Sequence, residues 1–467
     1  MGSTSRFDLA VIGAGPGGYV AAIRATQLGQ KVAVIEEDRP GGVCLNWGCI
    51  PSKALLCGAE LVENLRKHGE TFGVAADGIR LDYAKVVDHS RKSADRLCNG
   101  VQALFKKNRI ELVKGRGRLE GPTSVEVSGE SDRMVEASHI LLATGSREWV
   151  PAGFEVDGEC LLTSREALVS RRIPERLVVV GAGPVGIEFA YVYAMYGSKV
   201  TVVEMVDQML PGADREVAAA LQREFRRKGI EVRLGASFEA VEKVGGLVRV
   251  SVSGDGSSEE IEADQVLAAI GRRPLSDDLG LEKLGIAVDS RGFVGVDPQL
   301  RTSAPTVSAI GDLVGGALLA HKASEEGIAA VESLAGLDRA PLDHRRIPFC
   351  IYAQPQIAWI GLTEEEARSE FGDQLRVGRF PFTASGKAVA SAHTAGFVKL
   401  LVEPESGEIV GAHIVGQGAT ELIAEIGLAM TLEATTAEVA ATCHAHPTLS
   451  EALLEAALLA EDRGINL

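Results

Sequence analysis

The sequence predicts an α/β protein with two Rossmann-like dinucleotide-binding domains and a C-terminal α+β domain. The first observation is an internal duplication, in which a short apolar strand, a glycine-rich loop, a helical pattern, a second strand and an acidic residue occur twice in the same order. The second is a change after Ile347, where alternating strands are followed by two helical patterns, as expected of a separate α+β domain. A chain of 467 residues has room for about three domains.

The duplicated segments carry a specific signal for dinucleotide binding. The first copy consists of the strand Phe7–Ile12, the loop Gly13-Ala-Gly15-Pro-Gly-Gly18, a helical pattern, the strand Lys31–Ile35 and Glu36. The second consists of the strand Leu177–Val180, the loop Gly181-Ala-Gly183-Pro-Val-Gly186, a helical pattern, the strand Lys199–Val203 and Glu204. A glycine loop that follows a strand, opens a helix and precedes an acidic residue by about twenty positions is much more specific than the loop alone. Two copies therefore predict two bound dinucleotides.

Each part of the segment has a physical role. The first glycine permits a tight turn, the second lets the backbone approach the pyrophosphate, and the third allows the helix to pack closely on the strand. The phosphates then lie at a helix N-terminus, where N–H groups and the helix dipole favour anions. Glu36 and Glu204 are placed to accept hydrogen bonds from a ribose 2′-hydroxyl, unless they are simply solvated charges at strand ends. Because Met205–Asp214 contains no Arg to receive a 2′-phosphate, we expect the second site to prefer NAD to NADP.

A cysteine pair follows the first segment, in Gly41-Gly-Val-Cys44-Leu-Asn-Trp-Gly-Cys49-Ile-Pro-Ser-Lys53. Such a pair can form a disulfide when the first cysteine lies just before a helix or in its distorted first turn, because the Cα atoms then come within the roughly 4.4–6.8 Å that the bond tolerates. Pro51 favours a helix start nearby. We therefore predict a redox-active disulfide, with two unrelated buried thiols as the alternative. The other cysteines are predicted to be packing residues: Cys57, Cys98, Cys160, Cys350 and Cys443.

Composition and charge argue against several classes of protein. The formal net charge is −16, from 48 basic and 64 acidic residues, which disfavours binding to nucleic acid or to an anionic membrane. The stretch Arg223–Lys228 is a local basic exception. We see no signal-peptide pattern, and the apolar run Leu9–Ile23 contains too many glycines for a membrane span. We expect a cytoplasmic protein, since an odd and scattered set of cysteines suits a reducing compartment.

Three further motifs point to a known family. They are Ala309-Ile-Gly311-Asp312, Leu318-Leu-Ala-His-Lys-Ala-Ser-Glu-Glu-Gly327 and Cys443-His-Ala-His446-Pro-Thr-Leu-Ser-Glu451. Together with the two loops and the cysteine pair, they make the chain resemble the flavin-dependent pyridine nucleotide–disulfide oxidoreductases, and within them the members that oxidise dihydrolipoyl groups. The resemblance implies bound FAD and NAD. It implies an FAD-binding domain with the disulfide at 1–147, an NAD-binding domain at 148–274, a central domain completing the FAD site at 275–346, and a dimer-interface domain at 347–467.

The family pattern also assigns residues to each cofactor. It implies FAD contacts at Gly13, Gly15, Gly18, Glu36, Gly117, Thr144, Gly145, Ser146, Asp312, Leu318, Leu319, Ala320 and His321. It implies NAD contacts at Gly181, Gly183, Gly186, Glu204, Phe238 and Gly271. Lys53 and Glu188 resemble a charged pair set beside the flavin, although either could be a surface charge. Pro184 and Trp47 differ from the residues that many family members have at these positions. We therefore expect this chain to differ from those members in nicotinamide access, near Pro184, and in the disulfide pocket, near Trp47.

The resemblance implies a mechanism as well. Cys44 exchanges with the lipoyl sulfur, and Cys49 lies against the flavin as a thiolate. His446 removes the proton from dihydrolipoamide, since imidazole titrates near neutral pH, and Glu451 orients His446. Thr448-x-x-Glu451 is also a capping-box signature. The alternative role of Glu451 is therefore structural, as a cap of the helix that follows. Electrons pass from dithiol to disulfide to FAD and then, as hydride, to NAD⁺.

The partners that the resemblance implies are other chains. We expect a homodimer, in which His446 of one subunit serves Cys44 and Cys49 of the other. The substrate is the lipoyl domain of a 2-oxo acid dehydrogenase or glycine-cleavage complex, and we expect no nucleic acid, membrane or metal. The alternatives are another FAD/NAD(P) disulfide reductase, an NADH-dependent diaphorase or transhydrogenase, and a non-enzymatic docking or redox-sensing module. Turnover of free dihydrolipoamide separates these functions.

Overall fold

The computed structural model describes residues 6–75, 78–130, 132–254 and 256–467. These residues form two compact units. The first comprises the described residues of 1–54, 87–149 and 271–344, and the second those of 55–86, 150–270 and 345–467. Two long helices, α3 (Cys49–His68) and α4 (Tyr83–Lys107), contribute residues to both units. In the described ranges, none of the helices is long and apolar enough to cross a membrane.

The first unit is built on a sheet with the strand order β3-β2-β1-β6-β5-β4, in which β17 also pairs with β6. Its strands are β1 (Phe7–Ile12), β2 (Val32–Glu36), β3 (Glu111–Lys114), β4 (Arg116–Gly121), β5 (Ser124–Ser128), β6 (Arg133–Leu142) and β17 (Val307–Ala309). β1 is parallel to β2 and β6, and β17 is parallel to β6, whereas β4 and β5 are antiparallel additions. The apolar residues of β1 and β2 are buried, as expected of a parallel sheet with both faces covered.

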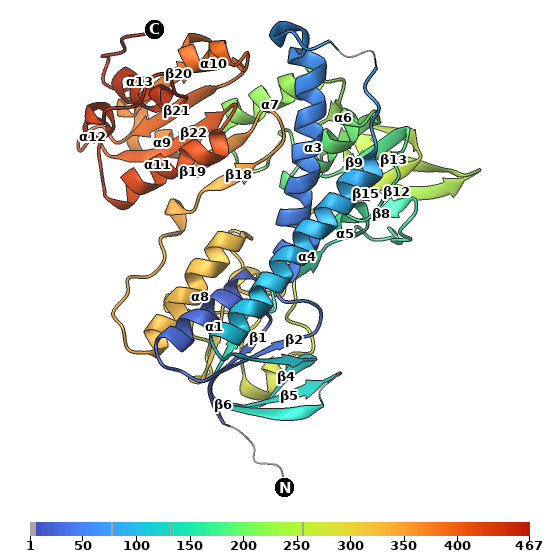
Figure 1. Ribbon diagram of the computed structural model, residues 1–467, viewed down its shortest axis with the longest axis vertical. Coiled ribbons are helices and arrows are strands. Elements are labelled where there is room, and N and C mark those ends of the chain that lie inside the picture. The colour runs from blue at the N-terminus through green and yellow to red at the C-terminus, as the bar shows by residue number, and fades with distance from the viewer. Residues whose placement is uncertain (1–5, 76–77, 131, 255) are drawn as a thin grey trace. The chain divides into compact units, whose positions relative to one another are not determined.

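Two helices of the first unit pack directly against each other, α1 (Pro16–Gln27) and α8 (Ala320–Leu334), as Figure 1 shows. Their close approach needs glycine. A Cβ atom on Gly17 would lie 2.9 Å from the carbonyl oxygen of Ala323, and one on Gly327 would lie 2.6 Å from the carbonyl oxygen of Gly17. The remaining elements of this unit are α2 (Gly42–Trp47), β7 (Ser146–Glu148), β16 (Arg272–Pro274) and the 3₁₀ helices η2 (Leu281–Leu284) and η3 (Gly311–Val314).

The second unit contains another parallel sheet, with the order β11-β10-β9-β15-β8. Its strands are β8 (Leu161–Leu162), β9 (Arg176–Val180), β10 (Lys199–Val203), β11 (Glu231–Arg233) and β15 (Gln265–Ala268). Its helices are α5 (Ser164–Ala167), α6 (Pro184–Met195) and α7 (Arg215–Arg227), and an antiparallel sheet is formed by β12 (Ser237–Val244), β13 (Leu247–Gly254) and β14 (Ser257–Ala263). In both parallel sheets the strand that leads into the glycine loop is central, which confirms the predicted pair of Rossmann-like folds.

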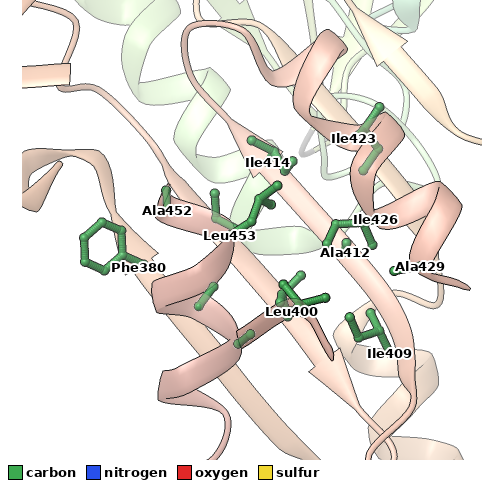
Figure 2. Packing of buried hydrophobic residues seen from close by; sticks show 14 of the residues in the cluster. Phe380, Leu400, Ile409, Ala412, Ile414, Ile423, Ile426, Ala429, Ala452 and Leu453 are labelled. Carbon is green, nitrogen blue, oxygen red and sulfur yellow. The ribbon is translucent and has the colours of Figure 1, made fainter. Parts of the chain in front are cut away.

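The C-terminal part of the second unit is an antiparallel sheet with the order β18-β19-β22-β21-β20, covered by helices. Its elements are β18 (Phe349–Ile351), β19 (Ile357–Gly361), α9 (Glu364–Phe371), β20 (Arg376–Pro381), α10 (Gly386–Ala390), β21 (Phe397–Val402), β22 (Ile409–Val415), α11 (Ala419–Thr431), α12 (Thr436–Ala441) and α13 (Glu451–Leu459). Figure 2 shows its core, in which Leu400, Ile414 and Leu453 pack between strands and helices. Three helices follow the last strand, whereas the sequence predicted two, because α12 is too short to show a clear period.

Candidate active site

The two glycine loops have nearly the same geometry. Gly13 and Gly181 have φ values of +103° and +106°, which side chains rarely adopt. A Cβ atom on Gly18 would collide with the carbonyl oxygen of Gly13, and Gly186 is related to Gly181 in the same way. In contrast, Gly15 and Gly183 face open space at the N-caps of α1 and α6. Each loop therefore leaves room for a phosphate at a helix N-terminus, which fits a dinucleotide.

The two acidic residues are tied to these loops. Glu36 Oε2 accepts a hydrogen bond from the N–H of Ala14 at 2.7 Å, and Glu204 Oε2 accepts one from the N–H of Ala182 at 2.7 Å. Their other carboxylate oxygens accept from the N–H of Asp38 at 2.8 Å and of Val206 at 3.1 Å. Burial raises the pKa of Glu36, although its two backbone donors oppose this shift. Both carboxylates are half-buried, so neither is a freely solvated charge.

The structure brings the two cysteines of the predicted redox pair into contact. Cys44 lies in the short helix α2, Gly48 ends that helix, and Cys49 is the first residue of α3. A hydrogen bond to the Cys49 side chain, together with burial, raises the pKa of the Cys44 thiol, while the positive charge of Lys53 lowers it. The two half-buried thiols are therefore neighbours, and Lys53 supplies the charge that favours a thiolate.

Residues that the sequence did not single out hold this segment in place. Asn46 is buried, and its Nδ2 donates to the carbonyl oxygens of Gly42 at 3.0 Å and Pro40 at 3.2 Å. The guanidinium of Arg91 lies 4.7 Å from the centre of the Trp47 ring and donates to the carbonyl oxygen of Asn46 at 2.7 Å. Trp47 itself donates to Asp38 at 2.8 Å. Arg91 comes from α4, far along the chain, so no local pattern indicated it.

Asp312 lies in a network that also includes Ser146. The Ser146 hydroxyl donates to Asp312 and accepts from Nε of Arg272 at 2.7 Å. The backbone beside Asp312 is held by a buried ion pair, because Lys322 Nζ lies 2.9 Å from Glu326 and donates to the carbonyl oxygen of Gly315 at 2.7 Å. Glu326 in turn accepts from the N–H of Gly311 at 2.7 Å. The motif containing Lys322 and Glu326 was noted in the sequence, but the pair itself was missed.

The other predicted FAD contacts lie in the same unit. The Thr144 hydroxyl donates to the carbonyl oxygen of Leu275 at 2.8 Å, and Gly145 has a φ of +74°. A Cβ atom on Gly117 would lie 3.1 Å from the side chain of Ile12, so close packing also explains this glycine. The predicted contacts Leu318–His321 lie at the start of α8. Leu319 is the N-cap, and Ala320 and His321 are the first two residues of the helix.

The remaining predicted cofactor residues are divided between the units. Glu188 is buried in α6 of the second unit and accepts from the N–H of Tyr352 at 3.1 Å, whereas Lys53 belongs to the first unit. Their pairing stays a prediction. Phe238 packs edge-on against Phe154 in the second unit, with ring centres 6.2 Å apart. Gly271 belongs to the first unit and has a φ of +132°.

The C-terminal motif places His446 beside Glu451. His446 Nδ1 lies 2.8 Å from Glu451 Oε1, and the other carboxylate oxygen accepts from the N–H of Thr448 at 2.8 Å. Glu451 is the first residue of α13, and Ser450 is the N-cap, so the predicted capping box with Thr448 as N-cap is only half formed. Burial would raise the pKa of Glu451, but the hydrogen bonds from Thr448 and His446 lower it. The carboxylate therefore caps the segment and orients the imidazole at once.

The two histidines of this motif have different environments. The His446 side chain is 78% exposed, whereas that of His444 is 3% exposed. His444 Nε2 lies 2.7 Å from Glu425, and Nδ1 lies 2.9 Å from the carbonyl oxygen of Thr442. Both ring nitrogens of His444 are thus engaged, which agrees with a structural role. The packing role predicted for Cys57 and Cys443 is wrong, since both are exposed.

Comparison with known proteins shows the family. Residues 7–327 match the model of the pyridine nucleotide-disulphide oxidoreductases, and residues 347–457 match the dimerisation domain of the same family. The chain therefore belongs to the pyridine nucleotide-disulphide oxidoreductases and carries their dimerisation domain. Among the described residues, no group of three or more His, Cys, Asp or Glu side chains is arranged to hold a metal ion.

Curated relatives narrow the comparison within that family. The chain is 46% identical over 457 residues to a dihydrolipoyl dehydrogenase of Chlorobaculum tepidum, with 97% of each chain covered, and 41% identical over 474 residues to that of Bacillus subtilis, with 99% of each covered. Among solved structures, LpdA from Mycobacterium tuberculosis has a TM-score of 0.90 at 28% identity, covering 97% of this chain and 99% of that one. The HOCl-induced flavoprotein disulfide reductase RclA from Escherichia coli has a TM-score of 0.85 at 26% identity, covering 96% and 98%.

Proposed function

We propose that this protein oxidises protein-bound dihydrolipoamide to lipoamide and reduces NAD⁺ to NADH. It is an FAD- and NAD-dependent oxidoreductase of the family described above. The observation that carries the proposal is the contact between Cys44 and Cys49, in the unit that also contains the first glycine loop. A dithiol substrate needs such a pair, because two electrons leave it only as a new disulfide forms.

The thiol chemistry follows from the two cysteines. In the oxidised enzyme they form a disulfide, and a lipoyl thiolate attacks the sulfur of Cys44, so that Cys49 leaves as a thiolate. The second lipoyl thiolate then attacks the lipoyl sulfur of the mixed disulfide and releases Cys44. The substrate ends as cyclic lipoamide, and the enzyme ends as the dithiol. Lys53 stabilises negative charge at the pair.

The proton acceptor in this proposal is His446. Its Nδ1 lies against a carboxylate and therefore carries the hydrogen of that bond, which leaves Nε2 to take the proton of the lipoyl thiol. Glu451 is a positioning residue, because it holds the ring and balances the charge that the ring gains. The exposed ring of His446 is accessible to a substrate carried on another chain.

The two cofactors fit the two loops. FAD would be held by Gly13, Gly15, Gly18, Glu36 and Asp312, and NAD would be held by Gly181, Gly183, Gly186 and Glu204. When bound, FAD accepts the two electrons of the dithiol and delivers them as hydride to NAD⁺. The predicted division into domains at 1–147, 148–274, 275–346 and 347–467 is part of this proposal.

The assembly belongs to the proposal as well. The dimerisation domain supports a homodimer, in which the segment with His446 of one subunit completes the dithiol site of the other. The physiological substrate is the lipoyl domain of a 2-oxo acid dehydrogenase or glycine-cleavage complex, and the protein acts in the cytoplasm.

The test is turnover of free dihydrolipoamide with NAD⁺, followed as NADH formation by the FAD-loaded dimer. We expect activity that Cys44→Ser and Cys49→Ser each abolish, while both variants still transfer electrons from NADH to an artificial acceptor that needs no thiol. If another disulfide substrate were turned over and dihydrolipoamide were not, the protein would be a different flavoprotein disulfide reductase, as RclA of Escherichia coli is.

A further inference from the structure

The second unit contains a cavity of about 620 Å³, and neither glycine loop is among its described lining residues. Its wall combines the last turns of α3 and α7 with segments of the C-terminal sheet. Five of the lining residues are Lys or Arg, and two are Glu. In a chain with a net charge of −16, this is an unusual concentration of positive charge. It includes most of the basic stretch Arg223–Lys228 that the sequence showed.

The cations of the cavity are engaged to different degrees. Three are paired with carboxylates: Lys228 with Glu63, Arg227 with Glu224, and Arg379 with Glu216. The other two, Lys67 and Arg223, are exposed and have no ion pair within the part of the chain that the structure describes. Two positive side chains therefore line the cavity without a compensating charge.

Two histidines also line the cavity, His68 and His393. The rings of His68 and His393 are in contact, with centres 4.7 Å apart. His393 Nδ1 lies 2.6 Å from the carbonyl oxygen of Ser391, and Nε2 lies 3.1 Å from Oδ1 of Asn64. Burial lowers the pKa of His68, and the neighbouring charges of His393 and Lys67 lower it further. The charged side chains of the lining are therefore mainly Lys and Arg, which favours an anionic ligand.

Helix ends explain only part of this cluster. Basic residues in the last turn of a helix stabilise its dipole, which accounts for Lys67 at the end of α3 and Arg227 at the end of α7. That explanation does not cover Arg223, which lies one turn earlier in α7, nor Arg379 and His393, which come from the C-terminal part of the unit. Side chains from three separate segments converge on the same cavity, as a binding site requires.

We propose that this cavity binds a small oxyanion with two or more negative charges, in the form of either a pyrophosphate group or a polycarboxylate. Lys67 and Arg223 are its principal contacts, because their charges are not used elsewhere in the described structure. The volume lies within the range of about 300–1,000 Å³ that is typical of small-molecule sites, whereas a protein partner would need a broader surface. The site is independent of the dithiol chemistry proposed above.

The test is calorimetric titration of the FAD-loaded dimer in phosphate-free buffer of low ionic strength. NAD⁺ is present at saturation, so that the dinucleotide sites are occupied. Inorganic pyrophosphate and citrate are the two probes. We expect at least one of them to bind with one site per chain, and Lys67→Gln and Arg223→Gln each to weaken its binding about tenfold, the usual effect of one lost charge-assisted contact.

The matched control is Arg226→Gln, which removes the same charge from the same helix at a position outside the cavity. It should change the affinity less than about twofold. Binding of pyrophosphate alone would identify a phosphate ligand, and binding of citrate alone a carboxylate ligand. The proposal is overturned if the parent protein binds neither probe, or if Arg226→Gln weakens binding as much as Arg223→Gln, since the effect would then be general electrostatic attraction.

Discussion

The two glycine-loop segments, β1–α1–β2 and β9–α6–β10, make the same turn but differ in what covers them. In the first, Gly17 follows the loop proline, and α8 packs so close that a Cβ atom there would meet the backbone of Ala323. In the second, the equivalent residue is Val185, which is exposed. The first turn of α1 is therefore covered by α8 at Gly17, whereas the matching position of α6, Val185, is open to solvent.

This difference suits two ways of holding a dinucleotide. The helix that covers the first loop also contains Lys322 and Glu326, which hold the backbone next to Asp312. Under the proposed function, a cofactor at the first loop would therefore lie beside α8 and would dissociate slowly. The second loop has no such cover among the described residues around Val185, so a dinucleotide there can exchange in every turnover. Under the function proposed above, the same local motif would thus serve a retained FAD and a diffusible NAD.

The largest expected effect separates the thiol chemistry, which lies outside both segments, from dinucleotide binding, which both segments share. General-base catalysis typically contributes about 10²–10⁴-fold, so His446→Gln should reduce lipoamide turnover by that factor. Transfer from NADH to an artificial acceptor should persist, because it uses both cofactors but no proton relay. His444→Gln is the control and should have a much smaller effect in both assays. Equal losses in both assays for His446→Gln would show that this histidine supports structure instead.

The next effect concerns an ion cluster of the second unit that lies outside both glycine-loop segments. Lys399 is buried and lies 2.7 Å from Asp214, at the N-cap of α7, and 3.0 Å from Glu364. Leaving such carboxylates without their partner costs about 3–5 kcal/mol, so Lys399→Met should lower the thermal midpoint strongly. The control is Lys243→Met, which breaks an exposed pair with Asp157 and should cost about 1 kcal/mol or less.

The same cluster predicts how this loss depends on pH. Burial would raise the pKa of Asp214 and Glu364, but nearby positive charges lower both, and bonds to these carboxylates raise the pKa of Lys399 despite its burial. Because the carboxylate pKa values are lowered in the folded protein, the ionised carboxylates add stability above about pH 4, and this stability is lost as the pH falls through the folded pKa values. The raised lysine pKa also adds stability, which is lost only well above about pH 10. The difference in midpoint between the parent and Lys399→Met should therefore be greatest near neutral pH and shrink in acid. A difference that did not shrink below about pH 4 would mean that packing, not charge, is lost.

A smaller effect tests the covering helix directly. Gly17→Val places a branched side chain against the backbone of α8, and overpacking of this kind costs about 1–3 kcal/mol. The purified variant should contain less FAD per chain, as measured by the ratio of flavin to protein absorbance. Val185→Ala changes the matching position of the open segment and should leave FAD content and stability nearly unchanged. Full FAD content in Gly17→Val would contradict the idea that α8 encloses the first site.

The smallest effect concerns the choice of nicotinamide cofactor. The parent should use NAD⁺ far better than NADP⁺, and Glu204→Gln should reduce the ratio of their kcat/KM values by about tenfold through the loss of one charge-assisted hydrogen bond. Glu36→Gln makes the matching change in the first segment and should leave this ratio as it is while weakening FAD retention. Equal use of the two nucleotides by the parent protein would remove the basis of the prediction.

Much of the candidate site was predictable because its parts are close together in the chain. Each glycine loop, its acidic residue and the helix between them form one continuous segment, so their spacing alone indicates the turn and the phosphate site. Cys44 and Cys49 are near neighbours as well, and the structure confirms that they meet. His446 and Glu451 share one loop and the start of α13, although the sequence could not show that Glu451 both caps the segment and holds the ring.

The sequence by itself therefore determined the fold class, the two dinucleotide loops and the dithiol motif. These features depend on glycine at particular backbone positions and on the spacing of residues that are close together in the chain. The tertiary structure alone decided which distant side chains support them. Arg91 reaches the cysteine loop from α4, Lys399 joins Asp214 to Glu364, and the cover over Gly17 comes from α8. These contacts depend on the direction in which each side chain points once the sheets and helices have packed. The periodicity of the sequence does not predict that direction, so the contacts could not be found from the sequence.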